Sequence, residues 1–194
     1  DEITRMYNTY YSPNRVSNGN FADIGNEEVE NGDFSEIGSE EVTNGDFATD
    51  SDWTLGSSWS ISGGKANYDA VTTASELRQL MSSIAVGKTV KIQFDISDVE
   101  AGKNAYFKLE CSGDPEAIFG YTTFSEGTYT YYHTIATAFN RLTFFPLNTG
   151  TGGYFSIDNI SVKEVGQDWV FDSNWTIDTA NSKAISDGSQ VGNV

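Results

Sequence analysis

Short runs in which apolar and polar residues alternate constrain the fold of this 194-residue chain most strongly. In the clearest run, residues 89–97, every second residue is apolar, and the segments 105–111, 128–135 and 141–145 are interpreted as further strands. Alternation of this kind puts one set of side chains on each face of a β-strand and is typical of a half-buried strand. No stretch shows a helical period. The sequence therefore predicts an all-β chain whose short strands, joined by Gly, Ser, Asn and Asp turns, form an antiparallel sandwich.

In the last alternating run, residues 155–162, the apolar residues switch from odd to even positions. Phe155 and Ile157 share one face, whereas Ile160 and Val162 continue the apolar set only after a slip of one residue between the two pairs. An extra residue in one strand of an antiparallel pair produces this slip. We therefore expect a β-bulge in the closing strand.

A 13-residue unit is repeated near the N-terminus. Residues 16–21, 29–34 and 42–47 share the pattern Val-x-Asn-Gly-x-Phe, and the spacers 24–28 and 37–41 also match. Asn-Gly favours a tight turn because both residues tolerate a positive φ. We interpret each unit as a short extended rung closed by a turn, which needs other rungs or chains to bury its three apolar residues. Duplicated linker sequence without fixed structure is the alternative.

A longer repeat relates two distant parts of the chain. Trp53 and Trp59 are six residues apart, as are Trp169 and Trp175, and in both copies an Ile follows two residues after the second Trp and a Lys-Ala pair comes later. This repeat predicts four parts: an extended N-terminal segment (1–15), a connector with the 13-residue repeats (16–43), a β-sandwich (44–165) and the start of a second, truncated module (166–194).

The truncated module carries four large apolar residues but lacks the later strands that would cover them: Trp169, Phe171, Trp175 and Ile177. An isolated two-stranded hairpin is at best marginally stable in water, and unpaired strand edges attract other chains. We therefore expect these residues to be buried, either by self-association or a neighbouring subunit or by further chain after residue 194.

The charge balance excludes some classes of partner. The chain has 28 acidic and 11 basic residues and a net charge of −17, which argues against binding nucleic acid through its phosphates and against anionic membrane surfaces. No apolar run approaches the length of a membrane-spanning helix, about 20 residues. The single cysteine, Cys111, cannot form an intrachain disulfide, and the single histidine, His133, excludes a site built from several histidines.

The opening and closing motifs of the predicted sandwich resemble a known superfamily. Asn44-Gly-Asp-Phe47 opens it, Trp53 follows, and Tyr154-Phe-Ser-Ile-Asp-Asn-Ile-Ser-Val162 closes it. This pattern resembles the jelly-roll carbohydrate-binding modules of the galactose-binding-like superfamily. It is closer still to repeated modules of bacteriophage tail fibres and related virion appendages, which combine such 13-residue units with a joint like Val162-Lys-Glu-Val-Gly-Gln-Asp-Trp169. The resemblance covers roughly residues 16–194 and implies a jelly-roll sandwich on a virion surface or outside the cell.

The resemblance also implies a structural calcium ion that ties the opening segment to the closing strand through hard oxygen ligands. Asp158 matches the closing aspartate of that pattern. Ala48 stands where the pattern has a glutamate, so Asp46 or Asp50 is the candidate replacement ligand. In the alternative interpretation Asp158 only accepts hydrogen bonds within a turn or bulge.

Glycan binding needs aromatic platforms combined with amide, carboxylate or guanidinium groups. The candidate residues are Arg78, Gln79, Tyr106, Tyr121, Tyr131 and Tyr132. The parity of 129–132 leaves open which of the last two tyrosines faces outward, and tyrosine is also a common residue at the edge of a sandwich core.

Adjacent carboxylates such as Glu27-Glu28 and Glu40-Glu41 lie in the short repeats, where solvated charge explains them, so no catalytic residue is predicted and we do not expect an enzyme.

The predicted function is that of a non-catalytic structural or adhesive module of a phage fibre or extracellular appendage, which presents a surface to a cell-surface glycan and contacts neighbouring fibre subunits. Two alternatives are kept: a carbohydrate-binding module of a secreted polysaccharide-degrading enzyme, and a self-assembling filament subunit without a ligand.

Overall fold

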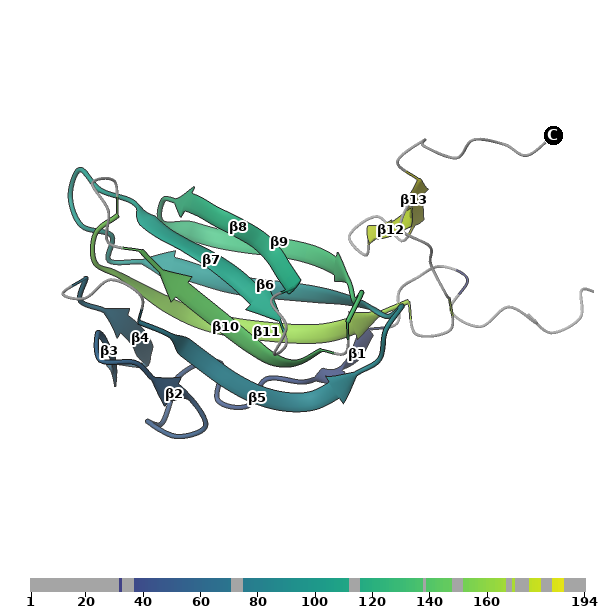
Figure 1. Cartoon of the computed structure of the whole chain (residues 1–194), viewed down its shortest axis with the longest axis horizontal. Coiled ribbons are helices and arrows are strands. Elements are labelled where there is room, and N and C mark those ends of the chain that lie inside the picture. Colours follow the sequence, from purple (N-terminus) through teal and green to yellow (C-terminus); the bar gives the residue numbers. More distant parts are fainter. Residues whose placement is uncertain are drawn as a thin grey trace, which may run out of the picture. The chain divides into compact units, whose positions relative to one another are not determined.

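The computed structural model describes residues 32, 37–70, 75–111, 116–137, 139–147, 152–166, 169, 175–178 and 183–186. These residues form β-strands and no helix, which confirms the predicted all-β class. Two antiparallel sheets pack face to face as a sandwich (Figure 1). The predicted segment 1–15 and the first two 13-residue units lie outside the described part, apart from residue 32. Within the described residues, no helix is long and apolar enough to cross a membrane.

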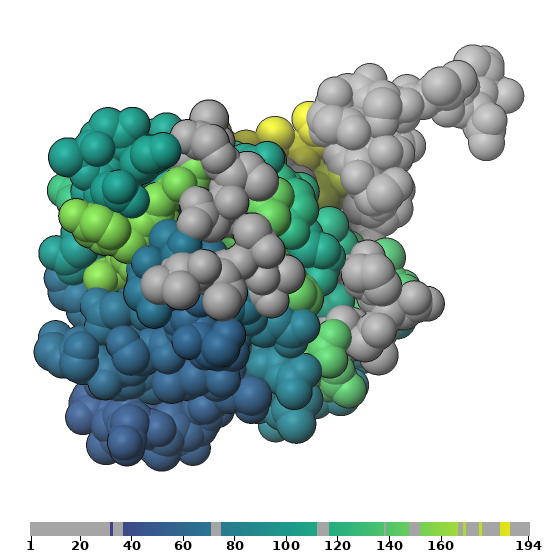
Figure 2. All heavy atoms as spheres, turned by 60° about the vertical axis from the view of Figure 1, so that its left-hand side comes forward, coloured from purple at the N-terminus to yellow at the C-terminus, as the bar shows by residue number. Residues whose placement is uncertain are grey.

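The first sheet has six strands in the order β3-β4-β11-β6-β9, with β1 also paired to β11. Their bounds are β1 Ile37–Glu40, β3 Trp59–Ser62, β4 Lys65–Tyr68, β6 Thr89–Ser97, β9 Gly127–Thr134 and β11 Phe155–Val165. β4 pairs with the first part of β11, whereas β1 pairs with its last part. Figure 2 shows the light-green start of β11 between the blue residues of the β3–β4 hairpin and the teal residues that follow β6.

The second sheet has five strands in the order β2-β5-β10-β7-β8. Their bounds are β2 Thr54–Leu55, β5 Leu77–Ile84, β7 Ala105–Cys111, β8 Glu116–Phe124 and β10 Phe139–Pro146. β8 has no counterpart among the predicted strands. Its pairing with β7 shifts register twice, so the alternation that marks the other strands is interrupted here.

The inward faces of the two sheets build one aromatic-rich core. The alternating residues of β6 and β7 that the sequence predicts to face inward are at most 2% exposed. Phe94 and Phe107 meet across the two sheets with ring centroids 5.7 Å apart. Full burial of side chains of this size stabilises the fold by roughly 1.5–3 kcal/mol each relative to exposure.

The expected bulge lies in β11. The pairing of β11 with β6 shifts register between Asp158 and Ser161. As a result Ile157, Ile160 and Val162 all face the core and are at most 3% exposed. Asn159 takes a φ of 50°, which is the left-handed conformation that asparagine tolerates better than most residues.

A separate two-stranded hairpin follows the sandwich in the sequence, with β12 Trp175–Asp178 and β13 Lys183–Ser186. In β3–β4, Ile61 is paired with Ala66 and Ser62 with Lys65. In β12–β13, Ile177 is paired with Ala184 and Asp178 with Lys183. The two halves of the long sequence repeat therefore form hairpins with the same register.

Candidate functional site

The outer face of the five-stranded sheet carries a group of charged, aromatic and hydroxyl side chains, which we call the β7–β10 face. It comprises Arg78, Tyr106, Lys108, Glu110, Tyr121, Arg141, Thr143 and Phe145. Because the alternate residues of β7 and β10 fill the core, the residues between them point away from it. Pleating alone thus brings side chains from four neighbouring strands to one surface.

Arg78, Thr143 and Glu110 lie side by side in one row across β5, β10 and β7, as direct cross-strand partners. Thr143 and Glu110 point away from the core, yet they are only 1% and 8% exposed. The Thr143 hydroxyl finds no hydrogen-bond partner among the described residues. A buried hydroxyl without a partner costs roughly 1–3 kcal/mol. The centre of the face is therefore a polar pair covered by its neighbours, and one of its hydrogen-bonding groups is unused.

An aromatic cluster surrounds Lys108 beside this polar pair. The Tyr106 and Tyr121 ring centroids are 5.5 Å apart. The Lys108 ammonium lies 4.5 Å from the centre of the Phe145 ring and 5.7 Å from that of Tyr121, and it also forms an ion pair with Glu110. Cation–π and ionic contacts together hold the lysine in place. Tyr121 remains 41% exposed, so its ring is accessible to a ligand.

A hollow of about 350 Å³ lies next to Arg78 at the β2–β5 edge. Its lining includes Thr54, Leu55 and the segment around Ser75 and Glu76. Arg78 forms an ion pair with Glu76 at 3.2 Å. The guanidinium thus connects the β7–β10 face with this hollow.

Three of the six residues proposed for glycan binding lie on the β7–β10 face: Arg78, Tyr106 and Tyr121. Gln79 instead faces the interior, where its Oε1 accepts from the Thr43 N–H at 2.9 Å and its Nε2 donates to the Thr43 carbonyl at 2.7 Å. This amide is therefore occupied by backbone and does not reach the outer surface.

The two tyrosines of β9 lie on opposite sides of the six-stranded sheet. Tyr131 pairs with Ile92 and faces the core, where the centroid of its ring is 4.6 Å from that of Phe119. Burial raises the pKa of the Tyr131 hydroxyl. Tyr132 pairs with Lys91 and faces outward, away from the β7–β10 face. Neither tyrosine lies on the β7–β10 face, because the strand parity places Tyr131 inside and Tyr132 lies on the outer side of the other sheet.

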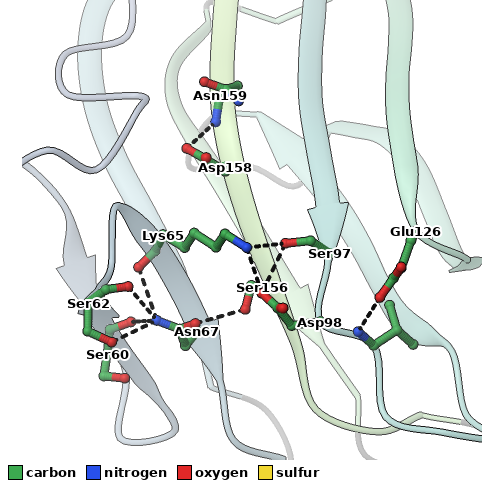
Figure 3. A network of polar contacts seen from close by, with 11 residues as sticks. Ser60, Ser62, Lys65, Asn67, Ser97, Asp98, Glu126, Ser156, Asp158 and Asn159 are labelled. Carbon is green, nitrogen blue, oxygen red and sulfur yellow. Dashed lines mark hydrogen bonds and ion pairs between the residues drawn. The ribbon is translucent and has the colours of Figure 1, made fainter.

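The outer face of the six-stranded sheet has a different character. Figure 3 shows a network of short polar side chains on β3, β4, β6 and β11. Asn67 donates to the Ser62 carbonyl at 3.2 Å and accepts from Ser156 at 2.8 Å. Lys65 donates to Ser97 and Asp98 at 3.0 and 2.8 Å. These groups satisfy one another instead of being left open for a ligand.

The three calcium candidates do not form a recognisable metal site. Within the described residues, no group of three or more His, Cys, Asp or Glu side chains is placed to hold a metal ion. Asp158 lies at the bulge and accepts from the Asn159 N–H at 2.7 Å, and Asp46 accepts from the Ala48 N–H at 3.3 Å. Near the opening segment, the Asn44 side-chain amide donates to the carbonyls of Thr49 and Ser51. Calcium binding stays a prediction.

Two of the proposed assembly residues have described side chains. Trp169 is half-buried, and Trp175 in β12 is 37% exposed. The backbone of Ile177 belongs to β12, but its side chain lies outside the described part, as does all of Phe171.

The sequence signal for the missed site residues was present in the strand alternation. Lys108 and Glu110 lie on the polar side of 105–111, and Arg141, Thr143 and Phe145 are alternate residues of 141–145. Their meeting point depends on β10 lying between β5 and β7, and periodicity does not specify strand order.

No protein-family model and no curated protein matches the chain. Similar solved structures are mostly carbohydrate-binding modules. One is the second N-terminal cellulose-binding domain of Cellulomonas fimi β-1,4-glucanase C, with 15% identity, coverage of 64% of this chain and 90% of that one, and a TM-score of 0.47.

Another is a xylan-binding module from Roseburia intestinalis, with 12% identity, coverage of 60% and 91%, and a TM-score of 0.44. The tailspike protein 4 of bacteriophage CBA120 is also similar, with 14% identity, coverage of 64% of this chain and 21% of that one, and a TM-score of 0.45. Likeness at this level assigns this chain neither a family nor a ligand.

Proposed function

We propose that this chain is a non-catalytic, extracellular glycan-binding module and that its ligand lies on the β7–β10 face. The observation that carries this proposal is the pairing, on one face, of the exposed Tyr121 ring with the buried Thr143 hydroxyl, which has no described partner. Small-molecule sites typically combine apolar and aromatic walls with a few polar groups that fix orientation. A sugar ring offers both an apolar C–H face and hydroxyl groups, so it matches this combination.

The ligand class follows from the charges of the face. Lys108 is paired with Glu110, and Arg78 with Glu76, so the charges of these four residues largely cancel and Arg141 is the remaining charged residue of the face. The whole chain has a net charge of −17, which repels polyanions. We therefore propose a neutral glycan. Because the carboxylates of Glu110 and Glu76 are each engaged by a cation, the face suits binding rather than acid–base catalysis.

Affinity electrophoresis or calorimetry against a panel of neutral polysaccharides tests the proposal. Tyr121→Ala removes an exposed ring of the aromatic cluster and should weaken binding by up to about tenfold, since an aromatic contact contributes about 0.5–1.5 kcal/mol beyond its buried area. Tyr132→Ala is the matched control, because it removes the same side chain from the opposite sheet and should leave affinity unchanged. Preference for sulfated polysaccharides, or equal losses in the two variants, would count against the proposal.

A further inference from the structure

The last 13-residue unit is an integral part of the sandwich. Residues 37–47, here called the docking segment, lie along the final part of β11. The Glu41 N–H donates to the Val162 carbonyl at 2.9 Å, and the Ile160 N–H donates to the Gly45 carbonyl at 2.9 Å. The docking segment thus supplies hydrogen bonds to the bulged half of the closing strand.

The side chains of the docking segment add specific contacts. Glu40 accepts from the Val162 N–H at 2.7 Å and from the Ser161 hydroxyl at 2.6 Å. Val42 and Phe47 are buried, with 6% and 1% exposure. Burial of two apolar side chains together with charge-assisted hydrogen bonds makes the segment a strongly held element of the fold.

The docking segment also reaches the second sheet. Its Thr43 backbone makes the paired hydrogen bonds with Gln79 of β5 described above. We call the combination of β11 residues 160–165 and Gln79 the receiving surface. Since Thr43 contacts Gln79 through its backbone atoms, this contact does not depend on the side chain at position 43.

Glycine is required at one point of contact. A Cβ atom on Gly45 would lie 2.0 Å from the backbone carbonyl oxygen of Ile160. Real Cβ atoms do not approach backbone so closely, and neither backbone can move without breaking its hydrogen bonds. Gly45→Ala therefore disables the docking segment by a defined mechanism.

Residues 24–34 repeat the docking segment almost unchanged. The sequences Ile-Gly-Asn-Glu-Glu-Val-Glu-Asn-Gly-Asp-Phe and Ile-Gly-Ser-Glu-Glu-Val-Thr-Asn-Gly-Asp-Phe differ only at Asn26 and Glu30, which match Ser39 and Thr43. Ser39 and Thr43 are both exposed. The residues that make the contacts are all retained: Glu27, Val29, Asn31, Gly32 and Phe34 match Glu40, Val42, Asn44, Gly45 and Phe47.

The first unit is a poorer copy. It keeps the Val-x-Asn-Gly-x-Phe pattern over 16–21, but Pro13 and Asn14 stand at the positions of Ser39 and Glu40. Proline cannot donate a backbone hydrogen bond, and asparagine lacks the carboxylate that accepts from Val162 and Ser161. Only residues 24–34 therefore match the receiving surface in full.

We propose that residues 24–34 of one copy of the chain bind the receiving surface of a second copy and join the two copies. Exchange of equivalent segments between protomers is a low-cost route to assembly, because the same contacts are made within and between chains. The chain's own docking segment has one advantage: Trp53 donates to the Asn44 carbonyl at 3.1 Å and packs on Phe47. In the repeat that contains residues 24–34, the position matching Trp53 is occupied by Glu40, so residues 24–34 lack both of these contacts. They therefore bind only receiving surfaces that the chain's own docking segment has left.

A mixing experiment with the full chain tests the proposal. The receiver is Gly32→Ala/Gly45→Ala, in which both complete segments are disabled, and the donor is the wild-type chain. Sedimentation velocity should show a one-to-one complex. The matched control donor, Gly32→Ala, should bind the receiver at least tenfold more weakly. Equal binding by both donors, or no complex with a folded receiver, would overturn the proposal.

If the receiver does not fold alone, the same pair of donors is used during refolding. An isotope-labelled receiver should regain a dispersed amide spectrum when it is refolded with wild-type chain and should not regain it with the Gly32→Ala donor. Equal recovery with both donors, or recovery with neither, contradicts the proposed exchange.

Discussion

The two outer faces of the sandwich are built by the same strand alternation but differ in what they leave unused. On the six-stranded sheet, short side chains such as Asn67, Ser156 and Ser97 bond to one another or to Lys65. On the five-stranded sheet, Thr143 is buried without a described partner, and Tyr121 is exposed. A self-satisfied face stabilises the fold, whereas an incompletely satisfied one has capacity for a ligand. This difference, rather than the number of polar residues, singles out the β7–β10 face.

The largest expected difference between the faces concerns their lysines. Lys108 neutralises Glu110, whose side chain is only 10% exposed, so Lys108→Met leaves a nearly buried carboxylate without its cation. We expect the free energy of unfolding to fall by about 2 kcal/mol, below the ~3–5 kcal/mol known for fully buried pairs. Lys65→Met on the other face removes an exposed pair and should have a much smaller effect. Urea denaturation compares the variants, and equal losses would remove the distinction.

Two hydroxyl deletions should change stability in opposite directions. Thr143→Val removes a buried hydroxyl without a described partner and should raise the free energy of unfolding by about 1 kcal/mol. Ser156→Ala removes the 2.8 Å hydrogen bond to Asn67 and should lower it by about 1 kcal/mol. Thermal melts give both values. If Thr143→Val destabilises the protein as much as Ser156→Ala does, the hydroxyl is already satisfied and the face is not poised for a ligand.

The smallest effect concerns the pKa values of Asp98 and Lys65 on the six-stranded sheet. The hydrogen bond from Lys65 is the main cause that lowers the pKa of Asp98 below its usual 3.8 and raises the pKa of Lys65 above 10.5. The contribution of Asp98 to stability is thus present above its unfolded pKa and is lost as pH falls through the lower folded value. That of Lys65 is present below 10.5 and is lost as pH rises through the higher folded value.

An NMR titration of the Asp98 carboxyl checks this prediction. In Lys65→Met, the pKa of Asp98 should move back toward the usual value. An Asp98 pKa that does not change in this variant would show that Lys65 is not its effective partner.

The sequence predicts much of the scaffold but only part of the site. Alternation specifies β6 and β7 and the bulge in β11, because those patterns depend on neighbouring residues within one strand. The alternation pattern did not reveal β8, because the register shifts in its pairing with β7 interrupt the two-residue period. Tyr106 and Tyr121 were among the predicted residues, whereas Thr143 and Phe145 were not, since their role depends on β10 lying between β5 and β7.

The hairpins show the same division between local and long-range information. β3–β4 and β12–β13 share one register, yet Trp59 is 6% exposed and Trp175 is 37% exposed. Local sequence sets the pairing. Burial of Trp59 depends on partners from elsewhere in the chain, such as the Phe155 ring 5.8 Å away and the Ser75 carbonyl that accepts from its indole at 3.1 Å.

Mapping of a bound neutral oligosaccharide by amide chemical shifts tests the central claim most directly. The account predicts that saturating ligand shifts the amides around Lys108, Tyr121 and Thr143 and leaves those around Gln93, Tyr132 and Ser161 on the other face unchanged. Shifts confined to the six-stranded sheet, or no shift with any neutral glycan tested, would contradict the assignment of the β7–β10 face as the binding site.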